Sequence, residues 1–541
     1  MEPSGSGDAT SSALARALLF VAALAFVLPL IAPAPLLDPD EGLHAAIAQE
    51  MLDRHDLVTP TFLGQPFLDK PVLFFWTEAA ALHLIGPTET AVRLPPLLFG
   101  LLGALSTALL GAALCGRRAG LAAGLVYSTL LLPLALSETA VHDIALVPFI
   151  NLAVLAFVRV SRGARILPWA AAAGLSLGLS ILTKGLVGVA FTGIAAAALV
   201  ALHRRETGRM VIAGVIALAI AAAITAPWYL AMERAHPGYL HYYFVDRHVR
   251  AVLTGTQPHA GRAWWYYLPI LMGGALPWLA YLPFVRLRIK HDERLAWIWL
   301  VGGLALLSAA DSKLVTYVLP VFPAVAILLA GAWLRAIEAP ERGAAASMST
   351  WTHGLLLAAL PLAAMLAAHS RFEIDYSNVA WAAAAAGAVF IIAIAAFAAR
   401  RRPVAGAAAS YAMFLVVGIV VFRPGLADAL SARGLAQTLN ARGTLPPQLV
   451  VFDERVGSLV FYLDPKLRAE LTPQRIQRVP ASELRERFGR LPKGSVIAVR
   501  STRVSAFEHL FAVRPKPFVH TADGDMSLYG PGCCRLTRIT R

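Results

Sequence analysis

Acidic side chains stand where apolar segments begin or end. Asp40 and Glu41 follow directly after the first apolar segment, and Asp143 comes after His142 at the start of another. A carboxylate at a membrane surface is costly unless it is paired or used, although an acid can also begin a solvated loop or cap a helix. Where it is used, it can take a proton from an attacking group or orient that group. Asp40 and Asp143, with Glu41 as a second choice, are therefore the candidate catalytic residues.

Basic side chains occupy the same kind of position. Lys70, Lys184 and Lys313 each stand in a polar break next to an apolar segment, and His248 and Arg250 lie in a longer polar stretch. A lone lysine at the end of an apolar helix usually reaches toward lipid headgroups. Several cations gathered on one face, beside the acids, can instead hold a phosphate and stabilise its charge as it leaves. We expect these residues to bind a phosphorylated substrate.

A metal site is a weaker hypothesis. Asp69 and His259 could hold a divalent ion, but two ligands are too few to define a site. An ion pair between Asp69 and Lys70, or between Asp69 and a loop arginine, explains the same residue more simply. The three cysteines show neither a CxxC motif nor a zinc-binding spacing, so the sequence predicts no certain cofactor.

The composition indicates which kind of protein must position these residues. Of 541 residues, 58% are hydrophobic and 15% are charged, whereas about a quarter of the residues of a soluble domain are charged. This is the composition of an integral membrane protein. The net charge of +14 fits basic loops and a basic tail, because the sequence has no compact basic domain with a nucleic-acid-binding motif.

Apolar segments long enough to cross a membrane, which takes roughly 20 residues, recur along the chain. The first is too long, and too interrupted by proline, for a cleaved signal peptide. We predict thirteen transmembrane helices, near residues 13–34, 92–114, 119–136, 143–158, 167–183, 185–202, 211–230, 265–285, 295–310, 314–334, 354–368, 379–399 and 404–422.

Arginine and lysine are concentrated in every second loop, including residues 117–118, 204–209 and 400–402. Basic loops stay on the cytoplasmic side of a membrane, so the N-terminus is expected in the cytoplasm. An odd number of helices then puts the C-terminus outside. We predict a membrane domain over residues 1–423 and an extracytoplasmic domain over residues 424–541.

The C-terminal segment has the pattern of a small α/β module. Residues 449–452 and 495–499 are strand-like apolar runs, and a polar helical stretch at residues 481–488 lies between them. The expected fold class is therefore an α-helical integral membrane protein with a small α/β domain at its C-terminus.

Two of the outer loops, residues 35–91 and 231–264, are too long to be simple connectors, and such loops are usually functional. The first of them places Leu43, Ile47 and Met51 on one helical face. That pattern predicts a helix lying along the membrane interface. Because these loops carry most of the candidate residues, we expect the chemistry at the outer surface.

Ordered motifs give the sequence a family resemblance. Asp40-Glu41 before the interfacial helix, then Asp69-Lys70-Pro71 and Phe75-Trp76, resemble the first outer loop of the type-C glycosyltransferases, in the branch of protein O-mannosyltransferases and lipid A aminoarabinose transferases. Further motifs keep the family's order over residues 38–323: Leu182-Thr183-Lys184-Gly185, Ala226-Pro227-Trp228-Tyr229, His248 to Arg250, Trp264 to Pro269, and Ser312-Lys313-Leu314. The resemblance implies the GT-C fold.

The sequence departs from the aminoarabinose transferases at several of these motifs. Leu43 and His44 stand where those enzymes carry an Arg-Tyr pair, and Asp69 replaces their glutamate. In the long outer loop, Arg247 and His248 stand in place of a Glu-His-like pair. These positions should contact the sugar or the acceptor, so the resemblance implies the type of reaction and leaves the substrate open.

The resemblance implies an inverting glycosyltransferase of the bacterial inner membrane. It would move a sugar from a polyprenyl-phosphate donor to lipid A, another part of lipopolysaccharide or a protein, on the periplasmic face. A single in-line displacement through a cation-like transition state is expected. Asp40 would act as general base or orient the acceptor, and Asp143 would position the partners of Asp40 or the acceptor. The expected partners are the lipid-linked donor, the acceptor and the membrane, without nucleic acid.

Two other classes of protein share the apolar composition. A transporter or flippase of a lipid-linked substrate would also have many spans, but transporters usually concentrate charges in mid-span and show repeat symmetry. Here the charges cluster in outer loops. A membrane scaffold would have no use for the ordered acids and lysines. Release of free polyprenyl phosphate would distinguish an enzyme from both.

Overall fold

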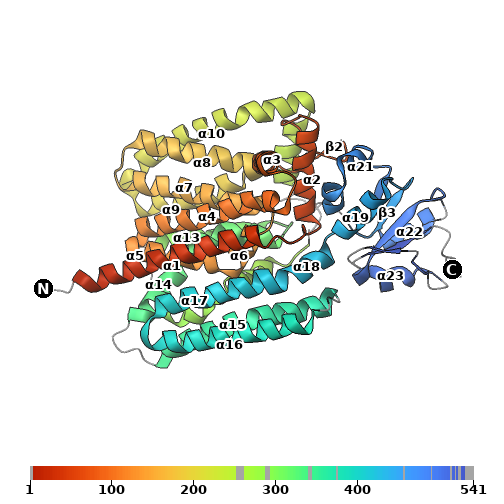
Figure 1. Cartoon of the computed structure of the whole chain (residues 1–541). Coiled ribbons are helices and arrows are strands. Elements are labelled where there is room, and N and C mark those ends of the chain that lie inside the picture. Colours follow the sequence, from red (N-terminus) through yellow and green to blue (C-terminus); the bar gives the residue numbers. More distant parts are fainter. Residues whose placement is uncertain are drawn as a thin grey trace.

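The computed structural model is a bundle of long helices that lie side by side, with a small sheet-containing domain at one end (Figure 1). It describes residues 4–250, 261–286, 293–338, 344–372, 374, 376–454, 457–488, 490–511, 515–517, 519–521 and 526–530. One large apolar core runs through the bundle with a smaller core beside it, and two further cores lie on the faces of the small sheet.

Nine helices in the described ranges are long and apolar enough to cross a membrane, or up to eleven if each bent pair counts as one crossing. The nine contain α1 (Ser4–Ile31), α4 (Glu89–Cys115), α7 (His142–Ser161), α8 (Ile166–Lys184), α10 (Thr207–Ala235), α14 (Phe322–Glu338), α15 (Ala344–Phe372), α16 (Asn378–Arg401) and α17 (Pro403–Val416). The bent pairs are α5 (Arg117–Thr129) with α6 (Leu131–Ser137), and η3 (Trp264–Tyr266) and α12 (Tyr267–Gly274) with η4 (Trp278–Phe284).

Each of the thirteen predicted segments coincides with one of these helices, with a bent pair, or with the shorter helices α9 (Val187–Leu202) and α13 (Arg294–Ala309). These two have 16 residues each, which is short for the hydrocarbon core of a bilayer. A multi-spanning helical membrane protein is thus confirmed, whereas thirteen crossings stay a prediction. The prediction omits one further apolar helix, α3 (Leu73–Ile85), within the first long loop.

Prolines account for both bends. The axes of α5 and α6 meet at 65°. The ring of Pro133 would collide with the carbonyl group four residues earlier, at Thr129, and α5 ends there. Pro277 stands likewise between α12 and η4, which meet at 101°. The first bend matters for the site, because the loop after α6 then brings Ala140 into contact with the helix that carries Asp40.

Small residues allow the closest helix contacts in the bundle. A side chain at Gly120 of α5 would meet the backbone of Ala108 and Ala112 of α4 at 2.4 Å. Membrane helices often approach each other through such small residues, because burial of apolar surface gives little driving force within lipid. The packing of α4 against α5 therefore depends on the absence of a side chain at this position.

The two ends of the bundle differ in character. At one end, Arg118 pairs with Glu338 at 2.7 Å, and Arg162 and Arg209 donate to backbone carbonyls of neighbouring segments. At the other end lie α2 (Asp40–Asp53), the hairpin of β1 (Thr61–Phe62) and β2 (Gln65–Pro66), and the sheet-containing domain (Figure 1). The candidate acids and most of the candidate cations belong to this second end.

The last span runs further than predicted. After α17, the π-helical turn η7 (Val417–Phe422) and α18 (Arg423–Leu430) continue the helix, so the predicted boundary at residue 424 lies within it. The segment that follows, from α19 onward, is called the C-terminal domain below. Its elements are α19 (Arg433–Arg442), β3 (Leu449–Phe452), α20 (Gly457–Tyr462), α21 (Pro465–Ala469), β4 (Ile476–Val479), α22 (Ala481–Phe488), β5 (Val496–Arg500), η8 (Ser501–Arg503), α23 (Val504–Glu508), β6 (Val519–His520) and β7 (Met526–Tyr529).

The C-terminal domain is a mixed sheet with helices on both faces. Its strand order is β4-β3-β5-β7-β6, in which β3 is parallel to β4 and β5, while β7 is antiparallel to its neighbours. Along β3, Leu449 and Val451 join the core under α19 and α20, and Val450 and Phe452 join the core under α22 and α23. Alternation of this kind is what a strand buried on both faces produces. The predicted α/β pattern matches β3, α22 and, shifted by one residue, β5.

Candidate active site

Helix α2 carries the first acidic pair across the end of the bundle (Figure 1). It begins at Asp40, and most of its length is buried. Ile47 and Met51, on the predicted apolar face, are fully buried, and Leu43 is half-buried. The helix therefore lies between the bundle, α3 and the C-terminal domain, and its first turn is fixed from several sides.

Glu41 is held by a buried ion pair. Arg93 of α4 donates from Nε to Oε1 of Glu41 at 2.8 Å and from Nη2 to Oε2 at 2.7 Å, and both side chains are almost fully buried. The amide of Leu37 also donates to Oε2, and Arg93 binds the carbonyls of Ala34 and Pro35. A bidentate ion pair of this kind fixes the relative orientation of the two side chains and also stabilises their contact. It ties α2 and the segment before it to α4.

Asp40 is in a different situation, although it is the neighbour of Glu41. Its side chain is exposed, and it makes no hydrogen bond or ion pair with any residue in the described ranges. A carboxylate in the first turn of a helix is favoured by the helix dipole. Asp40 is thus a carboxylate without a partner in the described ranges, at the end of the bundle.

Asp143 and Lys184 form a second ion pair, between the first turn of α7 and the last residue of α8. The ammonium group of Lys184 donates to Oδ1 of Asp143, and both residues are buried. The same ammonium lies 4.1 Å from the ring centre of Tyr317, in the turn η6 (Val315–Val321), which is a favourable cation–π distance. The pair and the ring together hold Lys184 in place.

Lys70 stands next to this pair, in the loop between the β1–β2 hairpin and α3. Within the residues that the structure describes, it donates no hydrogen bond and makes no ion pair. Loss of water around its ammonium group, and then the charge of Lys184, lower the pKa of Lys70 to about 8, against the opposing effect of Asp143 and Asp69. Lys70 is therefore charged at pH 7 but close to its titration point.

Two histidines lie beneath these charged groups. Nδ1 of His44 bonds the carbonyl oxygen of Ala140 at 2.7 Å, so this nitrogen carries the hydrogen and Nε2 is left as an acceptor. Burial lowers the pKa of His44, whose charge is also affected by Asp40, Lys70 and Asp143. The ring of His142 lies 4.6 Å from that of His44 and 4.7 Å from that of Phe74. The rings of His44, His142 and Phe74 thus pack together next to the charged cluster.

Asp69 contacts the second long loop. Oδ1 of Asp69 accepts from the hydroxyl of Tyr242 at 2.8 Å and pairs with Arg247 at 2.9 Å, both on the π-helix η2 (His241–Arg250). The described residues contain no group of three or more His, Cys, Asp or Glu that could hold a metal ion. His259 lies outside the described residues. The predicted metal pair gains no further ligand, and the simpler expectation of an ion pair to a loop arginine is what the structure contains.

Two further predicted cations, Arg250 and Lys313, make other contacts. Arg250 pairs with Asp246 of its own helix at 2.8 Å and is exposed. Lys313 is buried and donates to the carbonyls of Arg262 and Ala310, so its charge stabilises a loop and does not face Lys70 in the described contacts. His248 belongs to η2, but its side chain lies outside the described part. The cations that the structure brings together are Lys70, Lys184 and Arg247.

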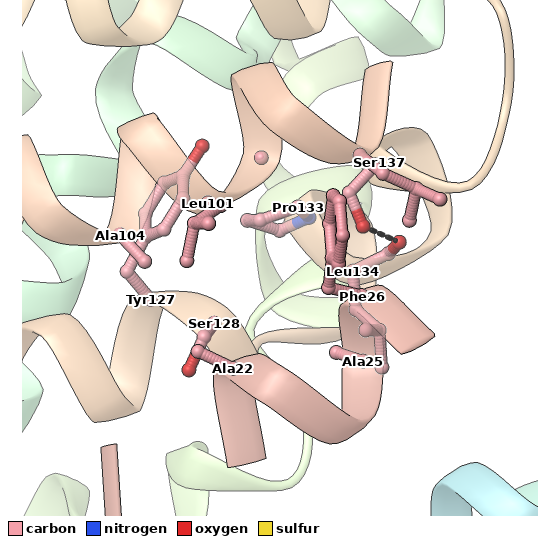
Figure 2. A pocket seen from close by; sticks show the side chains of 12 residues that line it. Ala22, Ala25, Phe26, Leu101, Ala104, Tyr127, Ser128, Pro133, Leu134 and Ser137 are labelled. Carbon is pink, nitrogen blue, oxygen red and sulfur yellow. Dashed lines mark hydrogen bonds between the residues drawn. The ribbon is translucent and has the colours of Figure 1, made fainter. Parts of the chain in front are cut away.

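An apolar hollow of about 380 Å³ opens between α1, α4, α5 and α6 (Figure 2). Its lining contains only three hydroxyl-bearing side chains, Tyr127, Ser128 and Ser137, among apolar residues. Ser137 uses its hydroxyl on the carbonyl oxygen of Leu134 at 2.7 Å. The hollow has no charged lining residue with which to bind a phosphate or to move a proton, so the charged cluster is the candidate active site.

The cluster contains two ion pairs and two charged side chains without an ion-pair partner among the described residues. Asp143–Lys184 and Asp69–Arg247 are ion pairs, whereas Asp40 and Lys70 lack such a partner among the described residues. The unpaired ammonium can receive an anionic group, and the unpaired carboxylate can accept a proton from, or orient, a hydroxyl. This arrangement suits the transfer of a group away from a phosphate.

Sequence reasoning missed several contributors. Arg93 carried a visible signal, because an arginine inside an apolar segment needs a partner, and Glu41 is that partner. His142 was noted only as the neighbour of Asp143, and Tyr317 was given no role. Arg247 was noted as a departure from the family pattern, whereas its contact with Asp69 depends on the fold of η2.

Comparison with known proteins supports the same family. Residues 69–230 match the family model described as dolichyl-phosphate-mannose-protein mannosyltransferase. The chain is 32% identical over 363 residues to the undecaprenyl phosphate-alpha-4-amino-4-deoxy-L-arabinose arabinosyl transferase of Aeromonas salmonicida, an alignment that covers 64% of this chain and 65% of that protein. It is 31% identical over 345 residues to the protein of the same name from Pectobacterium carotovorum, covering 62% and 61%. The chain thus spans just under two thirds of the length of these relatives.

A solved structure has the same fold. The crystal structure of ArnT from Cupriavidus metallidurans bound to undecaprenyl phosphate superposes with a TM-score of 0.73 at 21% identity, covering 95% of this chain and 97% of that one. The apo state of the same protein gives a TM-score of 0.71. The expected GT-C fold and the resemblance to the type-C glycosyltransferases are confirmed.

The buried pair of Glu41 and Arg93 leads to a prediction about stability. Arg93→Met leaves a buried carboxylate without its partner, which typically costs about 3–5 kcal/mol. We expect a large fall in the midpoint of thermal unfolding in detergent. Combining Arg93→Met with Glu41→Gln should recover much of the loss, because the second change removes the unpaired charge.

The control for this experiment is Arg234→Met, which removes an exposed arginine of α10 and should leave the midpoint nearly unchanged. If Arg93→Met unfolds like the control, the ion pair does not hold the first turn of α2.

Proposed function

We propose that this chain, a relative of the type-C glycosyltransferases in sequence and fold, transfers a sugar from a polyprenyl-phosphate donor to an acceptor of the bacterial envelope, either lipid A, another part of lipopolysaccharide or a protein. The observation that carries the proposal is the pair of unpartnered charges, Asp40 and Lys70, beside the buried pair of Asp143 and Lys184. The relatives named for undecaprenyl-phosphate-dependent arabinosyl transfer support it.

The basic side of the cluster binds the donor. Lys70 contacts the phosphate directly, and Lys184 and Arg247 add positive potential from ion pairs that are already formed. As the bond from the anomeric carbon to the phosphate oxygen breaks, the negative charge that develops on that oxygen is stabilised by cations whose positions do not need to change. No protonation of the leaving phosphate is required.

The acidic side of the cluster serves the acceptor. Asp40 takes the proton of an attacking hydroxyl, or orients an acceptor that is already ionised, while the acceptor oxygen forms its bond to the anomeric carbon. The displacement occurs in one step with inversion. Asp143 positions Lys184, and Glu41 positions Asp40 through its own contact with Arg93. Neither has to touch the reacting atoms.

The remaining predicted residues have supporting roles in this proposal. Lys313 shapes the loop before η6, through which Tyr317 reaches Lys184. Arg250 and His248 belong to η2, whose Arg247 and Tyr242 hold the loop of Lys70 through Asp69. The proposed reaction uses side chains of the described residues, and the metal pair of Asp69 and His259 stays a prediction.

The end of the bundle that carries the cluster faces the periplasm in this proposal, and residues 424–541 lie there too. The arginine contacts gathered at the opposite end support a cytoplasmic location for that end. The membrane would be the bacterial inner membrane, as expected for an enzyme that uses undecaprenyl-phosphate sugars on its outer face.

The orientation can be tested by reporter fusions. Phosphatase or fluorescent-protein fusions after Arg205 should indicate a cytoplasmic position, and fusions after Arg541 should indicate a periplasmic one. A cytoplasmic reading after Arg541 would place the whole cluster on the wrong side for a periplasmic acceptor.

Asp40 provides the sharpest test of the reaction. Asp40→Asn keeps the size of the side chain but cannot accept a proton, so turnover with a hydroxyl acceptor should fall by about 100-fold or more. Donor affinity should change much less, because the loss falls on the transition state. The measurement is release of undecaprenyl phosphate from undecaprenyl-phosphate sugars by the purified protein with lipid A or envelope protein as acceptor.

Asp464→Asn, a change at an exposed acid of the C-terminal domain, is the matched control. Near-normal turnover by Asp40→Asn would contradict the role of Asp40. Movement of intact donor across vesicles, without release of undecaprenyl phosphate, would favour a transporter or flippase over an enzyme.

The pKa of Lys70, lowered to about 8, predicts a pH dependence of donor binding. The lysine is charged below this value and loses its charge as the pH rises through it, whereas the phosphodiester donor keeps its charge over that range. The KM for the donor should therefore rise about tenfold between pH 7 and pH 9.

Lys70→Arg should remove this alkaline rise, because arginine stays protonated, while Lys466→Arg in the C-terminal domain should preserve it. A donor KM that is independent of pH in the wild type would exclude Lys70 as the phosphate-binding group.

A further inference from the structure

The C-terminal domain touches the candidate site through one short helix. α20 packs against the first turn of α2, and both helices have a glycine at the contact. A side chain at Gly42 would lie 2.2 Å from the amide nitrogen of Ser458, and a side chain at Gly457 would lie 2.2 Å from that of Leu43. The two backbones are in direct contact, so a movement of α20 must be transmitted to α2.

Polar contacts lock this packing. Asp38 lies two residues before Asp40 and accepts from the backbone amide of Ser458 at 2.9 Å and also from its hydroxyl. The guanidinium group of Arg500, at the end of β5, lies 4.0 Å from the same carboxylate. We call Asp38, Ser458 and Arg500 the α2 latch. The amide of Asp38 also donates to the carbonyl of Leu430 at 3.1 Å.

Arg500 connects the latch to the sheet. It is almost fully buried, pairs with Glu454, and donates to the carbonyls of Ala429 and Ser431 between α18 and α19. The latch therefore rests on the sheet and on the junction with the last span, which makes it a rigid support for the first turn of α2.

Burial of the charged Asp38 carboxylate in the latch is energetically unfavourable. Burial raises the pKa of Asp38 to about 7, an effect that the hydrogen bonds of Ser458 and the charge of Arg500 only partly offset and that the charge of Glu454 reinforces. A buried ion pair of this kind is weak evidence for a stabilising role. Its position, next to the one carboxylate of α2 that has no partner of its own in the described contacts, suggests a different role.

We propose that the C-terminal domain is a positioning element of the transfer site, in which the α2 latch aims the carboxylate of Asp40 at the acceptor. Among the described residues, none makes a contact that fixes the direction of the Asp40 side chain, so this direction is set by the backbone of the first turn. Arg93 holds that turn from the bundle through Glu41, and the latch holds it from the opposite side. The role assigned to Asp40 rests on the proposed function, whereas the mechanical part of the inference does not.

Two measurements on the full-length protein in nanodiscs test the inference. The first is hydrogen exchange of residues 38–44 without substrate, in Asp38→Ala, Ser458→Ala and Gly457→Ala. Each change should speed exchange of this segment and leave the first turns of α7 unchanged. Gly214→Ala in α10, where a side chain meets open space, is the control and should change neither.

The second measurement is turnover of undecaprenyl-phosphate aminoarabinose with lipid A. The latch variants should lower kcat about 10- to 100-fold, since misplacement of a reacting group by about 1 Å can have that effect. Donor KM should stay constant, because Lys70, Lys184 and Arg247 belong to other elements. Asp38→Asn should restore most of kcat, since its amide can bond both groups of Ser458.

The outcomes separate the two proposals. Unchanged exchange in residues 38–44 would overturn the latch, and faster exchange with unchanged kcat would overturn its positioning role. A parallel rise in donor KM, or failure of Asp38→Asn to restore kcat, would also contradict it, because general destabilisation would then explain the loss. Absence of turnover by the wild type would count against the proposed function alone, and the exchange measurement would still decide whether the latch holds α2.

Discussion

The end of the bundle that carries the candidate site depends on one ion pair removed from water. Glu41 and Arg93 would each be strongly unfavourable in this interior alone, and each makes the other tolerable. Because Arg93 also binds the carbonyls of Ala34 and Pro35, the pair fixes the exit of the first span as well as the start of α2. The position of every group on the first turn of α2, including Asp40, follows from that constraint.

The same rule, that charge near lipid must be compensated, explains how the site is divided. Lys184 is matched by Asp143, and Arg247 by Asp69, and these pairs keep the four charges in fixed positions. Asp40 and Lys70 are the exceptions in the described contacts. Both lie in the segment between α1 and α4, outside the spanning helices. The phosphate of a donor would balance the charge of Lys70, and the hydroxyl of an acceptor would bind the carboxylate of Asp40.

Much of this architecture follows from local patterns in the sequence. Apolar length located the helices, the spacing of Leu43, Ile47 and Met51 located α2, and apolar runs located β3 and β5. The pairing of Asp143 with Lys184 is consistent with their positions at adjoining helix ends. Local patterns could not reveal that Lys313 binds the backbone carbonyls of Arg262 and Ala310. They also could not reveal that two of the predicted spans are bent pairs of shorter helices.

Contacts between distant segments escaped prediction for a physical reason. Asp38 and Ser458 are 420 residues apart in the chain, and neither stands in a periodic pattern that would mark it. The acid next to an apolar span reads as an ordinary loop start, and a serine after a glycine reads as an ordinary turn. Only the folded arrangement of the last span, which returns the chain to the end where the first span emerges, brings the two together.

The glycine contact between α2 and α20 has an evolutionary consequence. Positions 42 and 457 both lie outside residues 69–230, the segment that matches the family model. Any side chain at position 457 would push directly on Leu43. Positions 42 and 457 are therefore expected to vary together across homologues, and hybrid proteins that combine one homologue's membrane bundle with another's C-terminal domain should be viable only when both partners supply a residue small enough for this crossing.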